Sequence, residues 1–255
     1  MSLELFKLDG RVALITGGTR GLGFVMAQAL AEAGASVIVT SREREKAEAA
    51  AGAIAQSTGQ RTLGLAVDVT VAEQVEAMVA SAVEAFGRID ILINNAGVNV
   101  RKPIEDYDEA SWDLVQNTNL KAPFLCARAV AKKMKSQRYG RVINMSSMLG
   151  SIALPERGAY CSSKGGLIQL TKVLALEWAP FNITVNALCP GPIATELNTV
   201  VMNNPEANRF FVDNIALGRW GRPEEIIGAV IYMASDASSF MTGASMVVDG
   251  GWTAR

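Results

Sequence analysis

The feature that most constrains the fold is a short apolar run that leads directly into a cluster of glycines. Residues 11–16 read RVALIT, residues 17–23 read GGTRGLG, and a helical pattern follows from about Leu22 to Ala33. Glycines let the backbone turn tightly and bring main-chain amides close to a diphosphate at the start of a helix. The run therefore predicts a buried strand, a phosphate-binding loop and a helix, and the alternative is an ordinary glycine-rich turn.

The same alternation of strand and helix continues to the end of the chain. It is typical of βαβ units and a parallel sheet, so we expect one α/β domain over residues 1–255, doubly wound, with helices on both faces. The seven expected strands are 11–16, 36–40, 63–67, 89–93, 141–145, 183–188 and 245–248. The expected helices are 22–33, 43–56, 71–86, two stretches within 107–135, 160–178 and 223–234. Residues 196–220 are polar and predict a mobile insertion that covers the substrate as a lid.

Composition narrows the class of protein. The 255 residues carry a formal net charge of −1 without a block of like charge, which indicates neither a nucleic acid nor an anionic membrane as a partner. The N-terminal residues lack a long apolar core, so neither a signal peptide nor a membrane span is expected. The three cysteines lack metal-ligand spacing and fit a reducing compartment. We expect a cytoplasmic protein without a metal site.

Tyr160 and Lys164 stand four residues apart in the sequence YCSSK, which places them on one face of a helix. A phenol has a pKa of ~10, and a neighbouring ammonium lowers that pKa. The chain contains no histidine, so a Tyr–Lys pair is a candidate acid–base group near neutral pH. Taken alone, the spacing more often belongs to a half-buried tyrosine beside a solvated lysine.

The end of the second strand indicates the type of nicotinamide cofactor. An acid there would bond the ribose 2′-hydroxyl of NAD(H), whereas this strand leads into Ser41 and Arg42. These two residues, together with Arg20 of the glycine loop, suit a 2′-phosphate, so NADP(H) is favoured and NAD(H) is the alternative. Glu43 and Glu45 argue for NAD(H) unless they lie in the first turn of a helix.

Six motifs, taken in order, resemble the single-domain branch of the short-chain dehydrogenase/reductase family, and the resemblance covers essentially the whole chain. They are the glycine loop 16–23, Asn94-Asn95-Ala96-Gly97, Asn117-Thr118-Asn119-Leu120, Asn144-Met145-Ser146-Ser147, Tyr160-x-x-x-Lys164 and Pro190-Gly191-Pro192-Ile193-x-Thr195. Each motif is weak alone, and the ordered set is very specific. The resemblance implies an NAD(P)-dependent enzyme that moves a hydride between a nicotinamide and the carbon of an alcohol or ketone.

By position, the resemblance implies four catalytic residues. Tyr160 would give or take the proton of the substrate oxygen, and Ser147 would hydrogen-bond that oxygen. Lys164 would lower the pKa of Tyr160 and hold the nicotinamide ribose, while Asn119 would hold a water that relays the proton. Ser146 is the rival to Ser147. The alternative role for Asn119 is a backbone clamp within its own helix, and both roles can hold together.

The resemblance also implies further cofactor contacts. Asn95 and Gly97 would line the adenosine side and brace the central strands, and Ile193 and Thr195 would contact the carboxamide and the pyrophosphate. Asp68 is either a contact for the adenine amine or a cap at the end of its strand. The predicted cofactor residues are Gly17, Thr19, Arg20, Gly21, Leu22, Gly23, Ser41, Arg42, Asp68, Val69, Asn95, Ala96, Gly97, Tyr160, Lys164, Pro190, Gly191, Ile193 and Thr195.

Within the family, the chain is most similar to gluconate 5-dehydrogenases and related sugar-acid or polyol dehydrogenases, through Asn-Ala-Gly-x-x-x-Arg-Lys-Pro at 95–103 and Arg-Trp-Gly-x-Pro at 219–223. The cations Arg101, Lys102 and Arg157 would suit a carboxylate or a polyhydroxy substrate, or they are solvated surface groups. The predicted substrate contacts are Asn99, Arg101, Ser147, Leu149, Arg157 and Tyr160.

Other functions stay open. A 3-oxoacyl-[acyl-carrier-protein] reductase would dock its acidic carrier through two basic residues, of which Arg138 matches the first while Phe181 stands at the second. A nicotinamide-binding regulator without turnover is a further alternative, against which the intact Tyr160 and Lys164 argue.

Family members form tetramers through apolar helix faces such as those near 111–135 and 160–178, so the resemblance implies a homotetramer.

Overall fold

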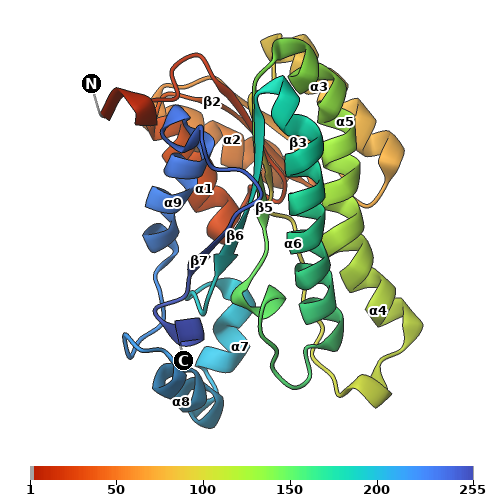
Figure 1. Ribbon diagram of the computed structural model, residues 1–255, viewed down its shortest axis with the longest axis vertical. Coiled ribbons are helices and arrows are strands. Elements are labelled where there is room, and N and C mark those ends of the chain that lie inside the picture. The colour runs from red at the N-terminus through yellow and green to blue at the C-terminus, as the bar shows by residue number, and fades with distance from the viewer. Residues whose placement is uncertain (1–2, 255) are drawn as a thin grey trace.

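The computed structural model describes residues 3–254, and their strands form one parallel sheet of seven strands (Figure 1). The strand order is β3-β2-β1-β4-β5-β6-β7. The strands are β1 (Val12–Ile15), β2 (Ser36–Ser41), β3 (Thr62–Ala66), β4 (Ile91–Asn94), β5 (Gly140–Met145), β6 (Ile183–Pro190) and β7 (Ser245–Val248). The order reverses between β1 and β4, and such a reversal opens a crevice at the carboxyl ends of the strands. The doubly wound fold and all seven predicted strands are confirmed.

Helices cover both faces of the sheet, because alternate residues of each strand point to opposite sides. Ala13 and Ile15 pack with α1 (Gly21–Glu32), α2 (Arg44–Thr58) and α9 (Ile227–Ala234). Val12 and Leu14 pack with α3 (Ala72–Phe86), α5 (Ala122–Gln137) and α6 (Gly158–Trp178), the three helices on the right in Figure 1. Within residues 3–254, no helix combines the length and the apolar character needed to cross a membrane.

The two helical stretches expected within 107–135 form one continuous unit. Asp108 begins it by accepting a hydrogen bond from the Ser111 amide at 2.6 Å, which caps α4 (Glu109–Gln116). A π turn over Asn117–Lys121 then joins α4 to α5 without a break. A π turn inserts an extra residue into the helix, and such turns occur frequently at functional sites.

The polar segment 196–220 contains two short helices, α7 (Thr199–Met202) and α8 (Pro205–Asn214). Asn204 caps α8 by accepting hydrogen bonds from the amides of Glu206 and Ala207, and Pro205 occupies the first helical position. Both residue types are typical of those positions. The segment therefore has regular structure that its polar composition did not indicate.

Candidate active site

Most of the predicted site residues lie in the loops that follow the strands at their carboxyl ends, while Asn119 lies in the π turn and Tyr160 and Lys164 lie in α6. Gly17 and Gly21 of the loop after β1 have φ angles of +62° and +51°, which other residues rarely adopt. A Cβ atom on Gly23 would overlap the carbonyl oxygen of Gly17, so only glycine fits there. This tight turn at the start of α1 fits the diphosphate of a dinucleotide.

Asn95 braces this loop from the neighbouring strand. Its side-chain amide donates to the carbonyls of Thr16 and Gly17, both at 2.9 Å. The Thr16 hydroxyl in turn accepts from the amides of Asn95 and Ala96 at 3.0 and 3.1 Å. These four bonds tie the loop after β4 to the loop after β1, so Asn95 has the bracing position that was expected.

At the end of β2, Ser41 and Arg42 lie beside the start of α2. The Ser41 hydroxyl accepts from the Glu43 amide at 3.2 Å, and the Glu43 carboxylate pairs with Lys46 at 2.7 Å. Glu45 lies in the first turn of α2. The two acids that argued for NAD(H) are therefore part of the helix start, and Arg42 is exposed at the strand end.

Asp68 caps the turn after β3, which is one of its two expected roles. Its Oδ1 accepts from the amide and the hydroxyl of Thr70 at 2.9 and 2.6 Å. The hydrogen bond from the Thr70 hydroxyl is the main cause of the lowered pKa of Asp68, and the charge of Arg42 contributes to the same effect. Among residues 3–254 its Oδ2 has no hydrogen-bond donor, so this oxygen can still receive an adenine amine. Val69 is buried in the core.

Arg20 lies elsewhere than expected. Its guanidinium pairs with the carboxylate of Glu196 at 3.3 Å, and both side chains are exposed. Glu196 belongs to the first turn of the lid segment, so this ion pair joins the phosphate loop to the lid. Sequence reasoning named no residue of the lid as a partner for Arg20.

Ser146 and Ser147 follow β5 and are distinguished by their hydrogen bonds. The Ser146 hydroxyl donates to the carbonyl of Lys164 at 2.9 Å, which fastens the loop to α6. The Ser147 hydroxyl accepts from the Leu149 amide at 3.1 Å, and it lies close enough to the Tyr160 phenol to oppose the rise that burial causes in the Tyr160 pKa. Ser147 is therefore the serine that the structure brings to Tyr160.

Tyr160 and Lys164 lie together near the start of α6, in the position that the spacing predicted. The Lys164 Nζ atom is 5.6 Å from the centre of the Tyr160 ring and donates to the Met145 carbonyl at 2.6 Å. Burial raises the pKa of the Tyr160 phenol and lowers the pKa of Lys164 to about 8. A Cβ atom on exposed Gly97 would lie 3.7 Å from Lys164 Nζ, so Gly97 leaves open the space beside the ammonium.

Asn119 is fully buried in the π turn and clamps the loop after β4. Its amide donates to the Val98 carbonyl at 2.8 Å and to the Ser163 hydroxyl at 3.2 Å. Its oxygen accepts from the Val98 amide at 2.8 Å. Both amide hydrogens are thus committed to protein atoms, and the clamp holds another loop, whereas the expected alternative was a backbone clamp within the helix of Asn119 itself.

The loop after β6 carries the remaining predicted cofactor residues. A Cβ atom on Gly191 would lie 2.5 Å from Cα of Asp249, so the close approach of the C-terminal segment requires glycine. Ile193 is buried and bridges to Gly221, and Thr195 begins the lid. Pro190, at the end of β6, directs the chain into this loop.

The three basic residues considered for the substrate site, Arg101, Lys102 and Arg157, lie in two different environments. Lys102 pairs with Asp108 at 2.8 Å at the start of α4. Arg157 keeps only 12% of its side chain exposed, and burial followed by the charge of Arg101 lowers its pKa. The charge of Arg101 also acts on Tyr160 and lowers its pKa. Arg101 therefore lies close enough to act on the catalytic phenol, Arg157 lies within reach of the charge of Arg101, and neither is a freely solvated surface group.

Asn198 of the lid is a site residue that sequence reasoning missed. Its amide donates to the Ile193 carbonyl at 2.9 Å, and its oxygen accepts from the Arg101 guanidinium at 3.4 Å. It thus links the loops after β4 and β6.

Asn99, a predicted substrate contact, has a buried Oδ1 without a hydrogen-bond donor among the described residues. Leu149 is buried in an apolar cluster that also contacts Tyr160.

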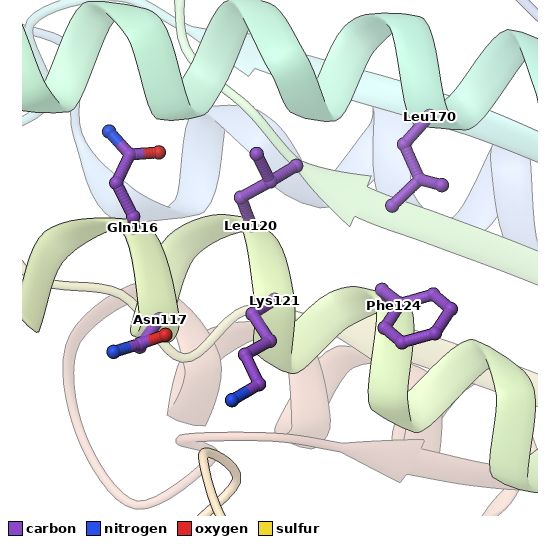
Figure 2. A pocket seen from close by; sticks show the side chains of 6 residues that line it. All are labelled: Gln116, Asn117, Leu120, Lys121, Phe124 and Leu170. Carbon is purple, nitrogen blue, oxygen red and sulfur yellow. The ribbon is translucent and has the colours of Figure 1, made fainter. Parts of the chain in front are cut away.

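A separate hollow lies on the outer surface between α5 and α6, away from these groups (Figure 2). Its volume is about 360 Å³, and its lining is almost entirely apolar. The residues that line it are Gln116, Asn117, Leu120, Lys121, Phe124 and Leu170.

Comparison with known proteins gives the same family that the motifs resemble. The family described as enoyl-(acyl carrier protein) reductase matches residues 17–253. An NAD-dependent glycerol dehydrogenase from Listeria innocua is 38% identical over 98% of this chain and 96% of its own length. A 2-dehydro-3-deoxy-D-gluconate 5-dehydrogenase from Dickeya dadantii is 39% identical, with all of both chains covered.

A solved structure extends the similarity to three dimensions. The crystal structure of a gluconate 5-dehydrogenase from Burkholderia cenocepacia in complex with NADP and tartrate matches with a TM-score of 0.97 at 37% identity, over the whole of both chains. The chain itself has a glycine loop at the start of α1, a Tyr–Lys pair in α6 and a serine near the phenol. The chain therefore belongs to the short-chain dehydrogenase/reductase family and is an oxidoreductase that acts on CH–OH groups.

Proposed function

We propose that this protein is an NADP(H)-dependent dehydrogenase that interconverts the secondary alcohol and the ketone of a sugar acid. The observation that carries the proposal is a pair of guanidiniums near the site: Arg101 acts on the Tyr160 phenol, and Arg157 lies within reach of the charge of Arg101. Two like charges near one partly buried site repel one another unless an anion lies between them. Glu156 offsets them only in part, because its carboxylate is 3.8 Å from Arg157. A substrate carboxylate would complete the charge balance, and Arg is suited to bind it through two parallel hydrogen bonds.

A polar atom in the loop that carries Arg101 suits a polyhydroxy chain attached to that carboxylate. Asn99 presents a buried oxygen without a donor, and a substrate hydroxyl would supply the missing hydrogen bond. A site built to hydrogen-bond a hydroxyl rejects an analogue that lacks it. The relatives named for 2-dehydro-3-deoxy-D-gluconate and gluconate support the same class of substrate.

In the oxidation direction, Tyr160 accepts the hydroxyl proton of the alcohol, and in reduction it returns a proton to the carbonyl oxygen. Ser147 hydrogen-bonds the same oxygen and fixes its distance from the phenol. Lys164 holds a positive charge close to the phenol, which favours the phenolate against the effect of burial. A bound nicotinamide ring takes up the hydride in oxidation and supplies it in reduction.

Several features favour NADP(H) over NAD(H). No acid ends β2, Arg42 is exposed there, and Glu43 pairs with Lys46. A guanidinium and the Ser41 hydroxyl suit a 2′-phosphate. The gluconate 5-dehydrogenase structure that contains NADP supports this preference, whereas one relative is named NAD-dependent. Arg42→Ala is expected to weaken NADPH binding roughly tenfold or more, with NADH binding unchanged.

The experiment that tests the function compares substrates that differ in charge. Wild-type enzyme is assayed for oxidation of D-gluconate and other sugar acids with NADP, beside neutral polyols such as glycerol. Arg157→Met is expected to raise KM for sugar acids about tenfold to hundredfold, because a charge-assisted hydrogen bond contributes roughly 1.5–3 kcal/mol, and to leave KM for polyols unchanged. Lys102→Met, which removes a cation that is already paired with Asp108, is the matched control.

Two further arms separate the mechanism from the substrate. Tyr160→Phe is expected to bind NADPH normally and to lose roughly 10²–10⁴-fold in kcat, because only the proton donor is removed. An acetoacetyl thioester is offered as the alternative substrate. If the wild type reduced only the thioester, or if Arg157→Met affected polyols and acids alike, the sugar-acid proposal would be overturned. Wild-type rates in Tyr160→Phe would overturn the acid–base role.

A further inference from the structure

A small apolar cluster joins the catalytic loop to the lid and to the C-terminal segment. It is separate from the two large cores on the faces of the sheet. Its buried members are Met148, Leu149, Ile215 and Trp252, and the half-buried side chains packed on them include Tyr160, Cys161 and Phe211. The cluster thus connects Tyr160 to Trp252, a residue more than ninety positions later in the chain.

Aromatic rings fasten the lid within this cluster. Phe211 of α8 lies 5.2 Å from Trp252 and 5.2 Å from Trp220, and it stacks on Trp220 with an angle of 15° between the planes. Phe210 approaches Trp252 edge-on at 6.0 Å. The Trp220 indole also donates to the Asn208 side chain of α8 at 2.7 Å. Such aromatic pairs stabilise their arrangement beyond the area that they bury, so α8 is held between Trp220 and Trp252.

The C-terminal segment is built to hold Trp252 in place. The Asp249 carboxylate accepts from the amides of Gly251 and Thr253, both at 2.8 Å, and from the Thr253 hydroxyl at 2.7 Å. Gly250 and Gly251 have φ angles of +65° and +85°, which favour glycine. A Cβ atom on Gly250 would lie 2.7 Å from the Ile215 side chain. The turn therefore lets the segment approach the end of the lid closely and fixes the direction of the indole.

We propose that Trp252 is a positioning residue that sets how far the lid closes over the substrate pocket. It touches no reacting atom. It acts through Phe211 and Leu149, which place α8 against the wall that carries Tyr160 and Ser147. This proposal rests on the proposed function, because it assumes that the substrate binds between the lid and the wall that carries Tyr160 and Ser147. When a protein binds only in one conformation, its apparent affinity falls with the population of that conformation. Loss of the indole is therefore expected to weaken substrate binding more than cofactor binding.

The first arm of the test needs no substrate. Hydrogen–deuterium exchange is measured on Trp252→Ala, Trp252→Phe and the full-length wild type. Trp252→Ala is expected to accelerate exchange in residues 205–214 by roughly tenfold or more, while β1, β4 and β5 keep wild-type protection. Trp252→Phe retains a ring that can pack on Phe211 and is expected to restore most of the protection. Phe240→Ala, at a fully exposed aromatic position, is the matched control.

The second arm measures kinetics with D-gluconate and NADP, and the NADPH dissociation constant by fluorescence. Trp252→Ala is expected to raise KM for gluconate roughly tenfold with the NADPH dissociation constant unchanged, and Trp252→Phe is expected to rescue KM. Unchanged exchange in 205–214, or loss of protection across the whole sheet, would overturn the proposal. An unchanged KM in an active Trp252→Ala enzyme would also overturn it. If the wild type oxidised no sugar acid, the proposed function would fail, and the exchange arm would still decide whether Trp252 fastens the lid.

Discussion

Lys164 is 5% exposed, and its ammonium donates to the main-chain carbonyl of Met145 at 2.6 Å. Burial lowers its pKa to about 8, whereas a lysine in an unfolded chain titrates at ~10.4. Between these two values the unfolded chain binds more protons than the folded chain, so the free energy of unfolding rises with pH. Below about pH 8, Lys164 is protonated in both the folded and the unfolded state. Burial of the charged ammonium then lowers the free energy of unfolding by about 3 kcal/mol.

This linkage predicts a measurable slope. Between about pH 8 and about pH 10, the wild type is expected to gain stability relative to Lys164→Met, up to about 3 kcal/mol. The variant also loses the bond to Met145, but that loss is the same at every pH and does not affect the slope. Urea denaturation followed by circular dichroism measures the difference. Lys172→Met, at an exposed position of the same helix, is the control. A constant difference between wild type and Lys164→Met would show that Lys164 titrates normally in the folded protein.

At the scale of the element, the π turn and its Asn119 clamp hold the loop that carries Asn99 and Arg101. Asn119→Ala leaves both main-chain groups of Val98 without partners. Each buried unsatisfied group costs roughly 1–3 kcal/mol, so we expect a loss of about 2–4 kcal/mol in the free energy of unfolding. Turnover is expected to fall more than about tenfold, because a small displacement of the loop misplaces the substrate.

Asn117 offers a matched control on the same turn. Its side chain is one of those that line the outer hollow (Figure 2). Asn117→Ala is expected to change stability by no more than about 0.5 kcal/mol and to leave turnover unchanged. Chemical denaturation and steady-state rates of the two variants decide the matter. Equal stability of Asn119→Ala and Asn117→Ala would show that the clamp on Val98 contributes nothing.

The elements themselves show what the sequence could predict. The strands were predictable because their apolar runs are short, rich in β-branched residues and bounded by glycines or polar turns. The π turn was not, because one extra residue in a helix hardly changes the spacing of its apolar positions. The lid helices were missed for a different reason. Asn204-Pro205 is a typical helix start, but the polar composition of the segment was taken as the stronger signal.

Some features of the site could be predicted from the sequence, and others could not. Tyr160, Lys164 and Ser147 were predictable because local spacing and the end of a strand determine their positions. The pairing of Arg20 with Glu196 and the packing of Trp252 on Phe211 were not predictable. These contacts join segments far apart in the chain, and only the completed fold brings such segments together.

At the scale of the whole molecule, the outer surface of α4, α5 and α6 exposes several large apolar side chains. Leu114, Phe124, Val173 and Leu176 are 49%, 43%, 50% and 80% exposed. The apolar hollow between α5 and α6 lies on the same surface (Figure 2). Contiguous exposed apolar surface of this kind marks an interface. We therefore predict a homotetramer in which these helices pack against those of a partner chain.

Light scattering coupled to size-exclusion chromatography tests this assembly. The wild type is expected to have four times the mass of the chain. The double variant Phe124→Glu, Leu176→Glu is expected to have a smaller mass and an unchanged circular dichroism spectrum. Charges buried at an interface without a partner are strongly unfavourable, which is why two glutamates should suffice. Leu5→Glu, also at an exposed apolar position but on the first turn of the chain, is expected to remain tetrameric. A monomeric mass for the wild type would contradict the prediction and would leave the exposed leucines of α4 and α6 without a role.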